Sequence, residues 1–157
     1  MEILPRLEKK LRPMKELMED NLYFNLYRDN RVLLLKTLLE SVEGENDRIP
    51  FYAYPVLGGA KRLRGYYLDT FRDKHAGTVA LEYRYPIHQY VLGELFADVG
   101  TVSEKYSELG RHWHPGFGFG FLFGTKEELH VKLDASFGEK ESVFFVTLNA
   151  PGAIFGD

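Results

Sequence analysis

Cysteine is absent from the 157-residue chain, and tryptophan occurs once. Without cysteine, neither a disulfide framework nor a thiolate metal site can form. The chain also has no large excess of either charge, because it contains 20 Lys plus Arg and 23 Asp plus Glu, for a formal net charge of −3. This balance gives no electrostatic reason to expect nucleic acid as a partner.

Long hydrophobic runs are also missing. The longest extend over only a few residues, as at 32–35 (Val-Leu-Leu-Leu), whereas a membrane-spanning helix needs about 20 apolar residues. Residues 1–20 are charged throughout and lack the apolar central region of a signal peptide. A β-barrel wall needs no apolar run, since only alternate residues face lipid, so a mean hydropathy of −0.28 leaves a membrane location open.

No pattern typical of catalysis or cofactor binding is present. No serine or histidine stands in a nucleophile elbow, and no glycine-rich phosphate loop opens a helix. His112 and His114 flank Trp113 without a nearby carboxylate pattern, which is weak support for a metal site. A loop in solvent or at a membrane rim, with Trp113 at the interface, fits these residues better. We therefore expect no catalytic residue, no metal and no cofactor.

The first twenty residues differ from the rest of the chain. Their apolar residues recur at spacings of three and four, which predicts one stripe of an amphipathic helix. The residues of this stripe are Leu4, Leu7, Leu11, Met14 and Met18. Pro13 is expected to kink or interrupt the helix. We thus predict a helical or linker segment at 1–20, packed on its own protein, followed by one domain at 21–157.

From Asn21 onward the apolar period becomes two, which is typical of strands. Alternating segments lie at 22–27, 78–87, 94–99, 116–123, 129–137 and 142–149. Turn residues separate the later ones, which favours an antiparallel meander. The segment 31–42 is apolar without a clear period, so helix and strand both stay open for it.

The two faces of the predicted strands carry different residues. One face has rows of Phe and Tyr, while the other includes Glu82, Arg84, Asp98 and Lys132. A soluble sandwich and a membrane barrel both tolerate this pattern. The four Phe at alternate positions of 117–123 favour lipid on the apolar face.

Ordered motifs then point to a family. Leu-Gly-Gly at 57–59 precedes Leu-Arg-Gly-Tyr at 63–66, and Leu-Glu-Tyr-Arg-Tyr-Pro follows at 81–86. Phe-Ala-Asp-Val-Gly at 96–100 comes next, and then a glycine-rich strand at 116–123. In this order and spacing the chain resembles the BamA-type bacterial surface-antigen superfamily over about residues 22–155.

The resemblance implies a particular site. In such barrels a long loop, here 57–74, folds back inside and presents an arginine to acidic groups on the inner wall. The loop motif would be Leu63, Arg64, Gly65 and Tyr66, and the acidic partners Glu82 and Asp98. A guanidinium offers a planar fork of donors suited to two carboxylates. Gly116, Gly118 and Gly120 would leave room for the loop beside the sheet.

Each of these features also has an ordinary explanation. Arg64 could be a surface arginine in a hairpin loop, and Glu82 with Arg84 could form cross-strand pairs on a wet face. The glycines could mark bulges or bends of a barrel. The joint order of the motifs favours the inward loop over these separate explanations.

The fold expected from the resemblance is all-β: the C-terminal half of an antiparallel transmembrane β-barrel, with about 7–8 strands. The implied function is a non-enzymatic component of the bacterial outer membrane that inserts or translocates other proteins. Its partners would be outer-membrane lipid, unfolded outer-membrane or secreted proteins, and itself or the remainder of a barrel. Two alternatives stay open: the membrane-anchoring barrel of a larger surface enzyme (a lipase or phosphoesterase), or a soluble β-barrel that binds an apolar ligand.

The chain departs from the family in two respects. It supplies fewer strands than a family barrel, and an open sheet cannot sit in lipid with unpaired edges. A fragment of a larger protein, a small self-closed barrel or closure by two chains would resolve this, and a self-closed barrel leaves least room for an inward loop. The last expected strand is followed by Ala150-Pro151-Gly152 rather than ending at an aromatic residue, as family strands usually do.

Overall fold

The protein folds into an antiparallel β-structure with almost no helix. The structure is a computed structural model that describes residues 14–26, 31–44, 49–124 and 130–149. No helix within these ranges is long and apolar enough to cross a membrane. The predicted all-β antiparallel fold is therefore confirmed.

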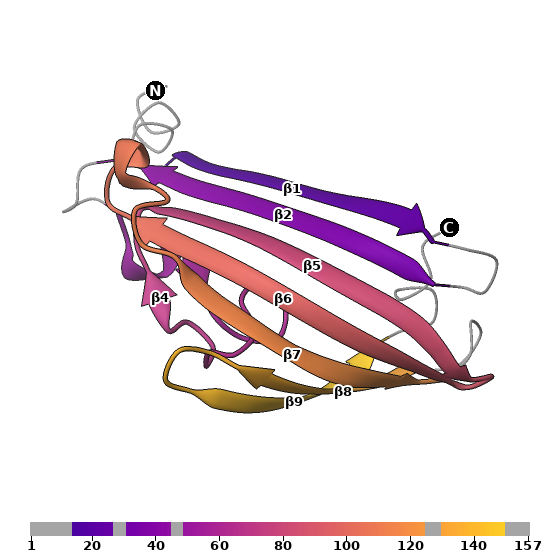
Figure 1. Cartoon of the computed structure of the whole chain (residues 1–157). Helices are drawn as coiled ribbons and strands as arrows, with labels where there is room; N and C mark the ends of the chain where they lie inside the picture. The colour runs from indigo at the N-terminus through magenta and orange to yellow at the C-terminus, as the bar shows by residue number, and fades with distance from the viewer. Residues whose placement is uncertain (1–13, 27–30, 45–48, 125–129, 150–157) are drawn as a thin grey trace, which may run out of the picture.

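Most of the described residues belong to one seven-stranded sheet, with strand order β1-β2-β5-β6-β7-β8-β9 (Figure 1). Its strands are β1 (Met14–Asn25), β2 (Val32–Glu43), β5 (His75–His88), β6 (Val91–Ser103), β7 (His114–Phe123), β8 (His130–Phe137) and β9 (Ser142–Asn149). Neighbouring strands are neighbours in sequence as well, so the sheet is a meander. Among the described residues β1 and β9 form its two edges, and the sheet is not closed.

One long excursion interrupts the meander between β2 and β5. It contains the short 3-10 helix η2 (Phe51–Ala53) and a two-stranded sheet of β3 (Val56–Leu57) and β4 (Phe71–Arg72). The main sheet curves around this excursion, which lies on its concave side (Figure 1). A second short helix, η3 (Tyr106–Glu108), lies in the connection from β6 to β7.

The helix predicted for residues 1–20 is wrong where the structure describes it. Residues 14–20 begin β1, which pairs with β2 from Met14 opposite Glu43 to Asn25 opposite Val32. A continuous ladder satisfies the backbone donors and acceptors, and such tertiary pairing overrides a local helical period. The part of the predicted helix at residues 1–13 lies outside the described residues. The ambiguous segment 31–42 forms β2, and β1 crosses the boundary predicted at residue 20.

The two faces of the main sheet differ in an unusual sense. We call the concave face, which carries Glu82 and Asp98, the inner face, and the opposite one the outer face. On the inner face the charged side chains are buried, with Glu82 only 1% exposed. On the outer face large apolar side chains are exposed, among them Leu95 at 50% and Phe119 at 46%. A sheet in water has the reverse arrangement, because burial favours apolar groups and disfavours charges.

A small apolar cluster joins the excursion to the inner face. Leu57, Leu63, Tyr66 and Ala76 are buried together, and Phe71 and Val102 pack against them. Gly100 on β6 makes room for this cluster, since a Cβ there would lie 2.8 Å from the Cδ2 of Leu63. The cluster fixes the loop between β3 and β4 against the sheet and so determines where Arg64 points.

Candidate functional site: a buried charge network under the inward loop

Arg64 is the centre of the site. Its Nε and Nη2 donate to the two carboxylate oxygens of Asp98, at 2.7 and 2.6 Å, in the bidentate geometry that suits a guanidinium. The backbone N–H of Arg64 donates to the same carboxylate at 3.0 Å. The guanidinium carbon lies 3.7 Å from the centre of the Phe96 ring, within the range of a cation–π contact. Side chain and backbone of Arg64 are therefore both held by β6.

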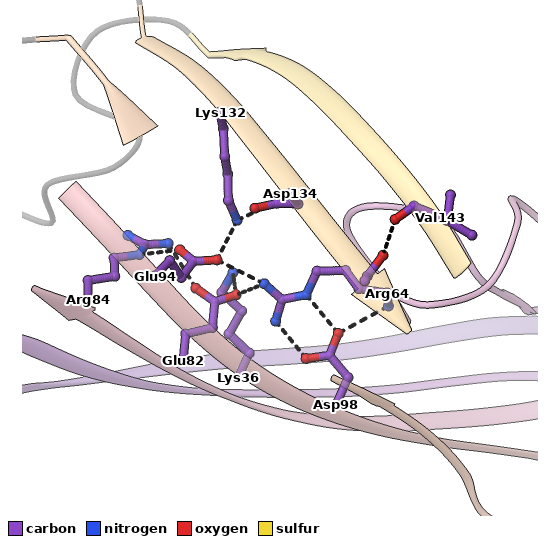
Figure 2. A network of polar contacts seen from close by, with 10 residues as sticks. Lys36, Arg64, Glu82, Arg84, Glu94, Asp98, Lys132, Asp134 and Val143 are labelled. Atoms are coloured by element: carbon purple, nitrogen blue, oxygen red, sulfur yellow. Dashed lines mark hydrogen bonds and ion pairs between the residues drawn. The ribbon is translucent and has the colours of Figure 1, made fainter. Parts of the chain in front are cut away.

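The remaining nitrogen of Arg64 connects two further carboxylates. Nη1 lies 2.9 Å from Glu82 Oε1 and 3.1 Å from Glu94 Oε1 (Figure 2). Glu82 comes from β5 and Glu94 from β6, so one side chain of the loop bridges two strands of the wall. All three acids are at most 2% exposed.

Further cations complete what we call the charge network. Arg84 bridges Glu82 and Glu94 at 2.9 and 2.8 Å. Lys36 on β2 reaches Glu82 at 2.8 Å, and Lys132 on β8 reaches Glu94 at 2.6 Å. The members of the network are Lys36, Arg64, Glu82, Arg84, Glu94, Asp98, Lys132 and Asp134 (Figure 2). Their formal charges cancel, so the network is neutral as a whole.

Arg64 remains charged in this setting. Burial alone would lower its pKa, but the hydrogen bonds and charge of Asp98, followed by the charges of Glu82 and Glu94, outweigh burial and raise it. Buried ion pairs often contribute little net stability, because desolvation offsets the attraction. Removing one partner is different, because it leaves uncompensated charge in the interior. The network therefore specifies one position of the loop more than it stabilises the sheet.

Two glycines allow the backbone of the loop to lie against the wall. Gly65 has φ of +96°, which side chains rarely adopt, and a Cβ there would lie 2.7 Å from the carbonyl of Phe137. Gly116 on β7 faces the loop, and a Cβ there would lie 1.9 Å from the carbonyl oxygen of Arg64. A side chain at either position would displace the loop backbone itself.

Gly118 and Gly120 make room for two further inward side chains, those of Phe96 and Asp134. A Cβ on Gly118 would lie 2.6 Å from the ring of Phe96, and one on Gly120 would lie 2.1 Å from Oδ1 of Asp134. The glycine-rich strand thus accommodates the loop at Gly116, the aromatic base under Arg64 at Gly118, and an acid of the network at Gly120.

Tyr66 fastens the other side of the loop tip. Its hydroxyl donates to the carbonyl of Pro115 at 2.8 Å and accepts from the N–H of Glu139 at 3.2 Å. Its ring packs edge-on against Phe71 with centroids 5.0 Å apart. Tyr66 thereby ties the loop to the start of β7 and to the turn between β8 and β9.

The structure brings together the site residues expected from the motifs: Arg64 lies with Glu82 and Asp98, Leu63 lies in the apolar cluster, and Gly65 and Tyr66 lie against the wall beside Gly116. The motif interpretation missed Glu94, although alternation places it on the face of Asp98. It also missed Arg62, which donates to Glu40 on β2 and to the carbonyl of Val56. Arg62 and Arg64 together attach the loop to three strands.

The polar side chains at the core of the site form ion pairs. Every polar group at its core is a carboxylate, a guanidinium or an ammonium paired with a partner of opposite charge. The described residues contain no group of His, Cys, Asp and Glu side chains arranged to hold a metal ion. The arrangement can hold a loop in one place inside the curved sheet.

Comparison with known proteins agrees with this architecture. The family described as the Omp85 superfamily domain matches residues 4–125 of the chain. This stretch includes β1 to β7, the inward loop and most of the charge network. No curated protein matches the chain.

Proposed function

Because the chain belongs to the Omp85 superfamily, we propose that it is a wall of a bacterial outer-membrane β-barrel that inserts or translocates other proteins. Superfamily members are outer-membrane components that act in protein insertion or translocation, typically without enzymatic activity. The proposed role of this chain is likewise non-enzymatic, and its proposed substrates are unfolded outer-membrane or secreted proteins.

The observation that carries a membrane location is the inverted polarity of the sheet. Phe117, Phe119, Phe121 and Phe123 alternate along β7 and are all exposed on the outer face. In water such a continuous apolar surface is costly and prone to aggregation, whereas in lipid it is the preferred surface. The same polarity disfavours a soluble barrel.

The proposed role of the charge network is to hold the inward loop in the conformation that handles substrate. Arg64 bridges β5 and β6, and Arg62 reaches β2, so the loop restrains the curvature of the wall. A wall that opens or changes curvature during insertion would have to break or slide these pairs. The network would thus select among conformations of the barrel.

The proposal also requires a partner for each sheet edge. Backbone groups exposed in the hydrocarbon region must be hydrogen-bonded, and only a closed barrel achieves this with strands. We propose that further strands, from the same polypeptide or from a second copy, complete the wall along β1 and β9.

The test is an insertion assay in vesicles. The protein is reconstituted in vesicles of outer-membrane lipids, and the folding of an added unfolded outer-membrane protein is followed by its protection from protease. The wild-type protein is expected to accelerate folding over empty vesicles, and Arg64→Ala to remove most of that acceleration. Arg111→Ala is the matched control, because Arg111 has a side chain 69% exposed and pairs only loosely with Glu108 at 3.6 Å.

Two results would contradict the proposal. A protein that stays folded in water without detergent and does not float with vesicles is not a membrane wall. A protein that enters vesicles but leaves the folding rate of the substrate unchanged is a wall without insertion activity.

A further inference from the structure

A polar cavity on the inner face lies between the inward loop and the curved wall, beside the charge network. It has a volume of about 290 Å³, near the lower end of the range for small-ligand sites, roughly 300–1,000 Å³. Ala60 and Lys61 of the loop line it, together with residues of β1, β2, β5, β7, β8 and β9. Strands from both edges of the sheet therefore contribute to one cavity.

Most charged residues that line the cavity are cations. Asp134 is only 1% exposed and pairs with Lys132 at 3.2 Å, whereas the side chain of Glu19 is exposed. Among the described lining residues, Glu19 is thus the one acid that opens onto the cavity. The charged lining residues are Glu19, Lys36, Lys61, Arg84, Lys132 and Asp134.

The acids that neutralise Lys36 and Lys132 stand behind them. Glu82 and Glu94 are each 1% exposed, and neither is among the described residues that line the cavity. The side chain of Lys36 is 36% exposed and that of Lys132 is 11% exposed. Figure 2 shows these two lysines and Arg84 gathered around the two glutamates. The network is neutral as a whole, but the side that it presents to the cavity is cationic.

The cavity also has more hydrogen-bond donors than acceptors to offer. Both oxygens of Glu82 and both oxygens of Glu94 already accept from cations of the network. An ammonium has three N–H donors, and Lys61 makes no ion pair or hydrogen bond with any residue that the structure describes. A ligand rich in acceptor oxygens and negative charge would complement these groups.

We propose that this cavity binds an oxyanion, either a phosphate or a carboxylate group, through the ammonium groups of Lys36, Lys61 and Lys132. Such a group has two sources, a free anion or the acidic side chains of a polypeptide inside the barrel. The inference goes beyond the proposed function, and only the second source rests on it.

Phosphorus NMR tests the site with inorganic phosphate as the probe. Phosphate is titrated with the protein in a detergent that contains no phosphorus, and broadening of its resonance is recorded. Broadening is expected to saturate near one phosphate per protein. A capped hexaglutamate peptide should reverse it, and capped hexaglutamine should not. Tighter binding of hexaglutamate than of phosphate identifies polypeptide carboxylates as the source, and the opposite order identifies a free anion.

Two substitutions with opposite expected effects sharpen the test. Lys61→Gln removes a cation outside the network and is expected to weaken phosphate binding by about threefold, as for a partly screened ion pair. Glu19→Gln removes the exposed acid and should tighten binding by about twofold for the same reason. Lys140→Gln is the matched control, because Lys140 is exposed in the turn between β8 and β9 and does not line the cavity.

Broadening that rises linearly with phosphate would overturn the site. So would an equal change in Lys61→Gln and Lys140→Gln, or weaker binding in Glu19→Gln. These measurements are made in detergent and are independent of the vesicle assay. A protein that floats with vesicles and accelerates folding of its substrate keeps the proposed function even if the cavity takes no anion.

Discussion

Glu94 and Leu95 are joined by one peptide bond on β6, yet they meet different surroundings. Glu94 is 1% exposed and contacts Arg64, Arg84 and Lys132. Leu95 is 50% exposed on the outer face. The pleat of a strand sends neighbouring side chains to opposite faces, so one sheet can separate two kinds of environment.

The difference shows that the two faces depend on different properties of their residues. The inner face depends on the position of individual atoms, since each carboxylate of the network meets a named donor. The outer face depends on polarity alone, because lipid contacts any apolar side chain of suitable size. Substitutions should therefore be judged by position on the inner face and by polarity on the outer one.

The largest effect is expected when the network loses its central cation. Arg64→Ala removes the cation that pairs with Asp98 and leaves the network one positive charge short, and removing one partner of a buried pair costs about 3–5 kcal/mol. Urea unfolding in detergent, followed by heat-modifiable migration, measures the change. Arg111→Ala should cost less than about 1 kcal/mol, as exposed pairs do. Equal effects of the two substitutions would remove the distinction between buried and exposed arginines.

A charge placed on the outer face should come next. Phe119→Arg is expected to cost roughly 2–4 kcal/mol in a bilayer if Phe119 lies near its midplane. Unfolding in lipid vesicles measures this, and Phe119→Leu serves as the apolar control with little change. A cost within about 0.5 kcal/mol, as for ordinary surface substitutions in water, would argue against lipid at this face.

A methyl group added on the inner face should lower the unfolding free energy by less than the two substitutions above. It should still lower it by more than a methyl group added on the outer face. Gly116→Ala places a Cβ 1.9 Å from the carbonyl oxygen of Arg64 and must displace the loop, at about 1–3 kcal/mol. At Gly77 on the outer face the added methyl meets its neighbours at 3.7 Å or more. The same unfolding measurement should find Gly77→Ala nearly neutral. If Gly116→Ala is neutral too, the loop does not lie as close to β7 as described.

The smallest change in unfolding free energy is expected at Tyr66, which lies beside the charge network at the tip of the loop. Tyr66→Phe removes the hydroxyl that bonds to Pro115 and Glu139 and should cost about 0.5–1.5 kcal/mol. Tyr67, its exposed neighbour, provides the control, since Tyr67→Phe should change the unfolding free energy less. A larger cost at Tyr67 would place the anchoring of the loop elsewhere.

Much of the sheet could be predicted because period-two alternation is a local property. It assigned Glu82 and Asp98 to one face, and the family resemblance, confirmed by the matching domain, added the inward loop. The N-terminal helix failed because spacings of three and four among apolar residues do not exclude a strand. Pairing with β2 decided residues 14–20, and no local pattern reports that pairing.

The rest of the network depends on register between distant strands. Lys36 meets Glu82 across 46 residues, and Lys132 meets Glu94 across 38. Each is a lysine on an alternating segment, of which a chain has many. Only the register of β2 with β5, and of β6 with β7 and β8, selects these two.

The order of the network along the chain has a consequence for folding. Arg64 precedes Asp98 by 34 residues, and Glu94 precedes Lys132 by 38. Each contact requires closure of a long loop. The chain loses the entropy of loop closure before any contact can offset that loss. Arg64 has no complete set of partners until β5 and β6 are in place, and the network as a whole is incomplete until Lys132 on β8 joins it. The charge network is thus a late product of folding, and its completion marks a wall whose strands have reached their final register.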